Sequence, residues 1–191
     1  VNESDYQKSK YIIIGCCIFI VLLTIGIYIY KRKQDYKKFK KFINKSEPIL
    51  HIEKQILPKK DNAKEYMSET TENNILKSLS ELEKSHFYLN KDISLNSVAV
   101  ELSINQRYLS YVINKHRTKD FASYINELRI NYIIDRLKND DNYLQYKISY
   151  LAELCGFSSH SRFTIIFKKV TGISPMNFIT YLQQEKNKSK D

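Results

Sequence analysis

The stretch 147–180 constrains the fold more than any other part of the sequence. Apolar residues at helical spacing precede Gly156, and a second set at i, i+3, i+4 and i+7 precedes Gly172. Glycine ends helices because it adopts positive φ without steric cost. The serines in 158–161 supply capping oxygens for a middle helix, and Ser174-Pro175 is an N-cap followed by proline at the first helical position. The stretch therefore predicts helix, turn, helix, turn, helix.

The middle helix of this stretch has a polar outer face that carries His160, Ser161, Arg162, Thr164 and Lys168. A short helix that packs across another and presents polar and basic side chains is the helix-turn-helix design for the DNA major groove. The residue order resembles the second helix-turn-helix of AraC/XylS-type transcription regulators. The matching residues are Ala152, Gly156-Phe157, Phe163, Phe167-Lys168-Lys169 and Thr171-Gly172-Ile173-Ser174-Pro175. The resemblance implies a bacterial regulator that binds an asymmetric DNA site as an elongated module.

A degenerate copy of the pattern lies upstream, at about 94–116, and resembles the family's first helix-turn-helix. Ser94 or Asn96 caps its first helix, 103–105 forms the turn, and Gln106 to His116 forms its second helix. The corresponding pairs are Ala99 and Ala152, Ser103 and Gly156, Leu109 and Phe163, and Ile113 and Phe167. The family usually has glycine where Ser103 and Thr118 stand, and often Phe-Lys-Lys at 113–115. We therefore expect this turn to be more strained or differently shaped than the second.

A long amphipathic helix at 120–138 is predicted between the two units. Its nineteen residues span about 28 Å, and adjacent major-groove faces of B-DNA lie about 34 Å apart. Such a helix can hold two recognition helices in successive grooves. With a further helix from about 75 to 89, residues 75–184 form an all-α DNA-binding domain of about seven helices, in which helix-turn-helix 2 covers about 147–171.

The candidate DNA-binding residues are the outward positions of the two recognition helices. Arg107 and Arg162 can each bind a guanine edge, Gln106 or Asn114 can recognise adenine, and Ile165 can touch a thymine methyl. Lys115, Arg117, Lys168 and Lys169 suit phosphates. The full set is Gln106, Arg107, Ser110, Tyr111, Asn114, Lys115, His160, Ser161, Arg162, Thr164, Ile165, Lys168 and Lys169. On the linking helix, Arg129 matches a family position, and we expect it to be structural and to pair with a nearby carboxylate.

Residues 11–30 form a run of twenty without a charge, with tyrosine at both ends. That length crosses a bilayer core of about 30 Å as a helix, and tyrosine suits both interfaces. A signal peptide would have a shorter apolar region and a small-residue cleavage site. We interpret the run as a single transmembrane helix in contact with membrane lipid; the alternative is a buried core helix.

The flanks of the apolar run predict its orientation. Residues 31–45 carry eight Lys or Arg and one Asp, whereas the charges before the run nearly cancel. The positive-inside rule places the C-terminal side, and with it the DNA-binding domain, in the cytoplasm, and leaves 1–10 as an extracytoplasmic stub. Residues 31–45 are either an amphipathic helix on anionic headgroups or a solvated continuation of the membrane helix.

The remaining segments are polar. Residues 31–74 form the basic juxtamembrane segment and a linker, with a short helix at 50–57 as an option, and 185–191 form a polar tail. The net charge of +10 is concentrated beside the apolar run, since 75–184 carry fourteen Lys or Arg against ten Asp or Glu. The DNA-binding hypothesis therefore depends on the motif and not on the overall charge.

Other functional classes find little support. The sequence contains no glycine-rich phosphate loop, nucleophile triad or zinc-ligand spacing, so we expect no enzyme, no cofactor and no metal. The three cysteines are expected to be free thiols. The alternative to a DNA-binding regulator is a membrane-anchored helical adaptor that binds a protein partner.

The chain begins with Val1, and only ten residues precede the apolar run. We expect it to be the C-terminal part of a larger receptor, with a sensor region upstream that shifts the population of a DNA-competent homodimer. The alternative is a short tethered protein started at a non-standard codon.

Overall fold

The computed structural model describes residues 3–45 and 67–188, and every regular element there is a helix. The chain divides into two units, which are described separately: the long helix α1 (Glu3–Lys45) and a helical unit that occupies 67–188. Residues 1–2, 46–66 and 189–191 lie outside the described residues, and with them most of the predicted linker, the optional helix at 50–57 and the end of the predicted tail.

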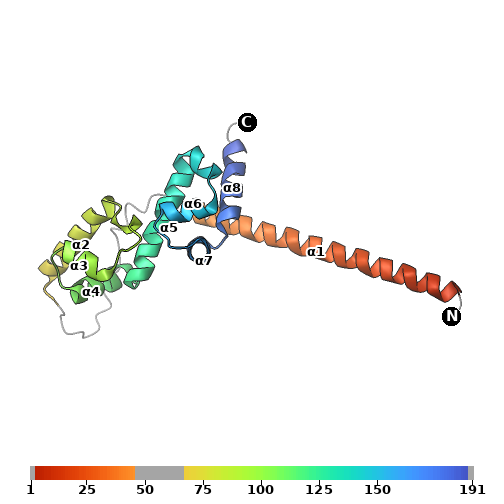
Figure 1. Cartoon of the computed structure of the whole chain (residues 1–191), viewed down its shortest axis with the longest axis horizontal. Helices are drawn as coiled ribbons and strands as arrows, with labels where there is room; N and C mark the ends of the chain where they lie inside the picture. Colours follow the sequence, from red (N-terminus) through yellow and green to blue (C-terminus); the bar gives the residue numbers. More distant parts are fainter. Residues whose placement is uncertain (1–2, 46–66, 189–191) are drawn as a thin grey trace. The chain divides into compact units, whose positions relative to one another are not determined.

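Helix α1 is continuous through both the apolar run and the basic segment (Figure 1). The helix thus continues through 31–45 without a break. Its apolar part lies within Lys10–Asn44 and reaches a mean hydropathy of 2.9 over eighteen residues, so by length and composition it can cross a membrane. At 1.5 Å per residue the whole helix is about 64 Å long, roughly twice the thickness of a bilayer core.

The second unit contains seven α-helices and two short 3₁₀ helices within its described residues. In chain order these are α2 (Glu69–Lys84), η1 (Phe87–Leu89), α3 (Leu95–Glu101), α4 (Gln106–Arg117), α5 (Phe121–Asn139), η2 (Asp141–Gln145), α6 (Ile148–Leu154), α7 (His160–Thr171) and α8 (Pro175–Lys188). The number of α-helices agrees with the prediction for this part of the sequence.

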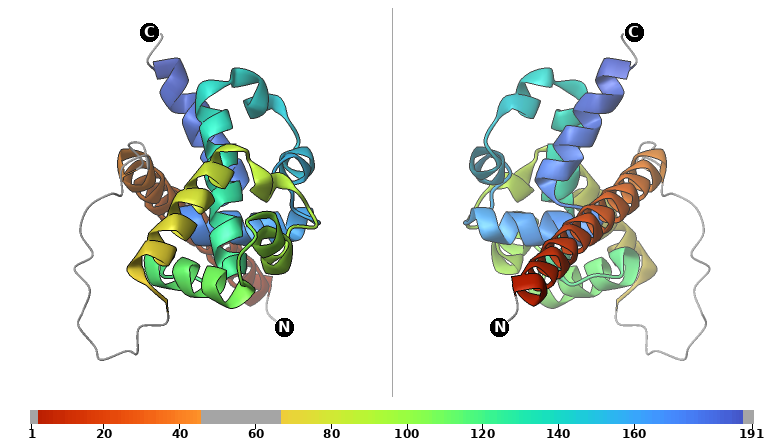
Figure 2. Two further views of the ribbon diagram at one scale, coloured as in Figure 1. Left: turned by 90° about the vertical axis from the view of Figure 1, so that its left-hand side faces the viewer. Right: turned by 90° about the vertical axis from the view of Figure 1, so that its right-hand side faces the viewer.

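The second unit is built around α5, the helix that links the two halves (Figures 1 and 2). Helices α2 to α4 lie on one side of it, and α6 to α8 lie on the other. Both α4 and α7 pack directly against α5, and α3 and α6 pack on α4 and α7. The fold thus mounts two similar helix pairs on one rigid linking helix.

Each half of the second unit has its own apolar core. The core of the first half includes Leu79 of α2, Val98 of α3 and Leu109 of α4, all fully buried. The second half is aromatic: successive ring centroids of Phe157, Phe163, Phe167 and Phe178 lie 5.4 to 5.5 Å apart. Aromatic pairs at such distances add to the stability that burial provides.

Helices α2 and α8 differ in extent from the predictions. Helix α2 begins at Glu69, several residues earlier than expected, because the Ser68 side chain caps it and accepts a hydrogen bond from Thr71 N at 3.2 Å. It ends at Lys84, and His86 then adopts a left-handed φ of 59°.

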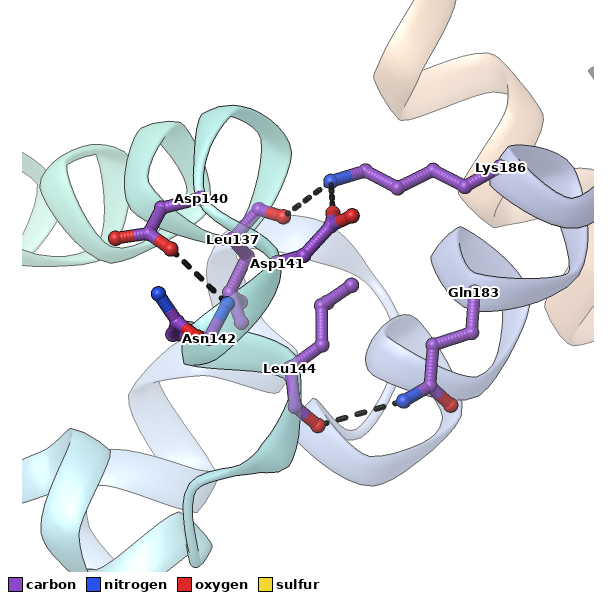
Figure 3. A network of polar contacts seen from close by, with 7 residues as sticks. All are labelled: Leu137, Asp140, Asp141, Asn142, Leu144, Gln183 and Lys186. Atoms are coloured by element: carbon purple, nitrogen blue, oxygen red, sulfur yellow. Dashed lines mark hydrogen bonds and ion pairs between the residues drawn. The ribbon is translucent and has the colours of Figure 1, made fainter. Parts of the chain in front are cut away.

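Polar contacts extend α8 to Lys188, through the first part of the predicted polar tail. Lys186 Nζ lies 2.6 Å from Asp141 Oδ1 and donates to Leu137 O at 3.3 Å, while Gln183 donates to Leu144 O at 3.4 Å (Figure 3). These contacts fasten the polar end of α8 to η2 and to the end of α5.

Candidate nucleic-acid interface

The two helix pairs, α3–α4 and α6–α7, share the same turn geometry. Ile104 N donates to Ala99 O and Phe157 N donates to Ala152 O, each at 2.9 Å. Each turn also contains one residue in the left-handed region, Ser103 at a φ of 54° and Gly156 at 77°. The predicted repeat is therefore present in the backbone. Of the two expectations for the first turn, the structure supports strain, since Ser103 adopts the left-handed conformation that glycine adopts in the second turn.

The ends of the two recognition helices, α4 and α7, also correspond. Asn105 Oδ1 accepts from Arg107 N at 2.8 Å, and Ser159 Oγ accepts from Arg162 N at 3.2 Å, so each helix has a side-chain N-cap. At the other end Thr118 and Gly172 both have positive φ, 52° and 83°. The same register therefore governs which side chains of α4 and α7 point outward.

The predicted recognition residues lie on the outer faces of α4 and α7. All are exposed except Tyr111 and Thr164, which are half-buried. Ile165 is the most conspicuous of them, because 67% of this large apolar side chain is exposed. Thr164 departs from the prediction: its hydroxyl oxygen is buried and has no hydrogen-bond partner within the described structure.

The six predicted residues of α4 lie around one open depression of about 840 Å³, which Leu95 and Asn105 complete. The residues that the structure brings together there are Gln106, Arg107, Ser110, Tyr111, Asn114 and Lys115. The depression places an arginine, two amides and hydroxyl groups beside one another, which are the side chains that hydrogen-bond to base edges in the major groove.

Lys115 differs from the other candidate cations because α2 holds its side chain. Its Nζ lies 2.7 Å from Glu72 Oε1 and over the Tyr111 ring, and His116 Nε2 lies 2.5 Å from the same carboxylate. Burial alone raises the pKa of Glu72, but the hydrogen bonds from Lys115 and His116 outweigh burial and lower it; the same contact raises the pKa of Lys115.

A second carboxylate of α2 holds the next cation of α4. Glu83 Oε1 lies 3.2 Å from Arg117 Nη2 and accepts from the Tyr124 hydroxyl at 2.6 Å. The basic end of α4 is therefore largely neutralised. The equivalent end of α7 carries exposed Lys168 and Lys169, which form no salt bridge within the described ranges.

Arg129 joins the two halves of the unit. Its Nε donates to Tyr88 O at 2.6 Å and its Nη2 to Asn90 O at 2.7 Å, and its guanidinium lies 5.5 Å from the Phe157 ring centroid. The expectation that Arg129 pairs with a carboxylate is therefore wrong. Gly156 fits closely beside this junction, because a Cβ there would lie 2.3 Å from Leu89 O.

Sequence reasoning missed the contribution of α2 and the true partners of Arg129. The contacts of Glu72 and Arg129 join residues about forty positions apart, and no local pattern signals them.

Neither the cysteines nor any cluster of metal-binding side chains in the described residues indicates a second functional site. Among the residues that the structure describes, no cluster of His, Cys, Asp and Glu is suited to a metal ion. All three cysteines are free thiols. Cys155 is fully buried, donates to Leu151 O at 2.9 Å, and has a pKa that burial raises to about 12, so its thiol is unreactive at neutral pH.

Comparisons with known proteins find similarity over part of the chain. The Porin thermoregulatory protein EnvY of Escherichia coli (strain K12) is 28% identical over 98 residues, which are 51% of this chain and 35% of that protein. The chain thus spans about a third of the length of this curated relative.

Solved structures give overlaps of similar extent. ToxT from Vibrio cholerae O395 is 27% identical, with 56% of this chain and 39% of ToxT covered at a TM-score of 0.48. A transcriptional regulator described as AraC-type, from Chromobacterium violaceum, is 19% identical, with 61% of this chain and 98% of that chain covered at 0.49.

Residues 98–180 match the family described as "Helix-turn-helix domain". The matched segment contains both turns, both recognition helices and the linking helix. The match identifies residues 98–180 as a helix-turn-helix domain, and the residue order around Gly156 and Gly172 resembles that of AraC-type transcription regulators.

Proposed function

We propose that this chain is a membrane-tethered transcription regulator that binds a specific DNA sequence through α4 and α7 in successive major grooves. The observation that carries the proposal is the repeated turn, which mounts two exposed polar helix faces in the same register on one linking helix. Recognition helices enter the major groove with such faces. The nineteen residues of α5 suit the separation of two adjacent grooves.

Individual side chains have distinct proposed roles. Arg107 binds a guanine edge from the depression on α4, with Gln106 or Asn114 on a neighbouring adenine. On α7, exposed Ile165 packs on a thymine methyl, and Lys168 and Lys169 bind phosphates without reading sequence. Lys115 contributes less to phosphate binding than the other lysines, because its side chain forms an ion pair with Glu72.

Binding-site selection with the full chain in neutral detergent, followed by footprinting, tests this function. Arg107→Ala is expected to weaken the selected site by about 1–3 kcal/mol and to relax preference at one base pair. Lys169→Ala is the matched control, because loss of a phosphate contact weakens all duplexes alike and makes the salt dependence less steep. If the wild type binds every duplex equally weakly, the adaptor alternative is favoured.

The proposed tether rests on α1. Its apolar part is long enough for a bilayer, and its basic part continues the same helix. The lysines after the apolar run favour a cytoplasmic position for the DNA-binding domain.

Reporter fusions after Lys45 test the tether and its orientation. A reporter that works only in the cytoplasm should be active there and should sediment with membranes. Activity only from a reporter that needs export would show the opposite orientation. A reporter found in the soluble fraction would contradict the proposed tether and leave the DNA-binding proposal unaffected.

A further inference from the structure

A cavity of about 280 Å³ lies where the two halves of the second unit meet. It is lined by the segment before α3, by the first half of α5 and by the turn and first residues of the α6–α7 pair. The polar and charged residues among its lining are Lys91, Ser94, Asn126, Arg129, Ser158 and Arg162. No carboxylate lines it within the described part of the chain.

Arg129 gives this cavity a buried cation. The residue is 8% exposed, and its Nε and Nη2 are used by Tyr88 O and Asn90 O. A guanidinium has five N–H donors, and the structure shows no acceptor for Nη1 among the described residues. The backbone contacts therefore fix the guanidinium plane at the wall of the cavity and leave donors for a further group.

Arg162 brings a second guanidinium to the same cavity. Burial lowers the pKa of Arg129, and the neighbouring charge of Arg162 lowers it further, so the two cations repel each other. Among the residues that the structure describes, Lys91 alone of the nearby cations has a carboxylate partner, Glu153 at 3.3 Å, and Glu153 does not line the cavity. Uncompensated charge of one sign at a partly enclosed site favours an anion between the two arginines.

We propose that this cavity binds a phosphate group between Arg129 and Arg162, with the hydroxyl of Ser158 and the amide of Asn126 as further donors. Arginine suits this role because its planar donors match phosphate oxygens in pairs. A phosphate group can come from a small phosphorylated ion in solution or from the backbone of bound DNA. The first source does not depend on the proposed function; the second rests on it.

Thermal unfolding of the full chain in neutral detergent tests the site without DNA. Inorganic phosphate should raise Tm saturably relative to chloride at equal ionic strength, by about 5 °C at roughly ten times the dissociation constant. Equal Tm values in the two salts would overturn the proposal.

Two variants assign the effect to the cavity. Asn126→Asp is nearly isosteric and places a carboxylate beside both arginines, so it should raise Tm in chloride and abolish the increment from phosphate. Arg162→Gln should also abolish the increment without lowering Tm in chloride, because it removes a repulsion. Arg136→Gln makes an equal charge change on the exposed side of α5 and should keep the rise in Tm with phosphate. If Arg136→Gln also loses this rise, the effect depends on overall charge, and the proposed site is wrong.

Methylphosphonate substitution of single DNA phosphates, within the footprint, distinguishes the sources. If the DNA backbone supplies the phosphate group, one methylphosphonate position should lower the DNA affinity of the wild type about tenfold. The same substitution should leave the DNA affinity of Asn126→Asp unchanged. If the source is a free ion, no position should show this coupling, and phosphate should stabilise the DNA complex as it does the free protein. Failure of DNA binding with a retained phosphate increment would reject the proposed function and leave the site standing.

Discussion

At the scale of single residues, the two helix-turn-helix units differ most at positions with positive φ. Ser103 and Thr118 stand in the first unit where Gly156 and Gly172 stand in the second, and all four adopt left-handed conformations. A residue with a Cβ loses about 1–2 kcal/mol in that region, and glycine does not. The first unit therefore stores strain that the second avoids.

The C-caps of α4 and α7 allow a reciprocal test of this strain. Thr118→Gly should raise the free energy of unfolding by about 1 kcal/mol, and Gly172→Ala should lower it by about as much or more. Urea unfolding of the full chain in neutral detergent measures both changes. A Thr118→Gly variant less stable than the wild type would show that the threonine side chain contributes more than its backbone costs.

At the scale of elements, the sequence predicts what is local. The glycines, the serine caps and the apolar spacing of α4 and α7 lie within a few residues of the feature that they determine, and these helices begin and end close to their predicted bounds. The start of α2 was missed because Ser68 lies in a polar run without apolar periodicity. The pairing of Glu72 with Lys115 crosses 43 residues and needs the packed fold to exist.

The contact between α2 and α4 has a defined dependence on pH. The lowered pKa of Glu72 means that its pairing stabilises the fold above its ordinary pKa of 4.5 and is lost as pH falls through the folded value. The raised pKa of Lys115 means that its share is present below 10.5 and is lost as pH rises through the folded value. The ion pair of Glu72 and Lys115 therefore makes its full contribution to stability between pH 4.5 and pH 10.5.

Glu72→Gln tests this pairing and its effect on DNA. At pH 7 the variant should be less stable by about 1–2 kcal/mol, and the difference should disappear as pH falls below the lowered pKa of Glu72, where the carboxyl group is protonated in both states. Because Lys115 is then free to bind a phosphate, the logarithm of DNA affinity should fall more steeply with the logarithm of salt concentration. The slope should change by the amount expected for about one additional phosphate contact. Glu101→Gln, at an exposed position of α3, is the control and should change neither property.

At the scale of the whole second unit, α5 and Arg129 determine how the two recognition helices are placed. Helix α5 touches both, and Arg129 fastens its middle to the carbonyls of Tyr88 and Asn90 beside the second turn. Gly156 permits that approach, since any side chain there would meet Leu89 O. The spacing of helix faces was predictable from the length of α5, but the rigidity of their junction was not, because it depends on these long-range contacts.

Arg129→Lys is expected to loosen this spacing without removing either recognition face. A lysine keeps the positive charge but cannot make two fixed donor contacts in one plane. The wild type should lose at least about tenfold in affinity when two base pairs are inserted between the half-sites, because the two extra base pairs rotate and shift one groove away from its recognition helix. Arg129→Lys should bind the original site more weakly and show a much flatter dependence on spacing, as measured by a titration series over duplexes of different spacing. Arg136→Lys, on the exposed side of the same helix, should follow the wild type. If Arg129→Lys lowers affinity equally at every spacing, Arg129 does not set the separation of the two recognition helices, and α5 sets that separation without it.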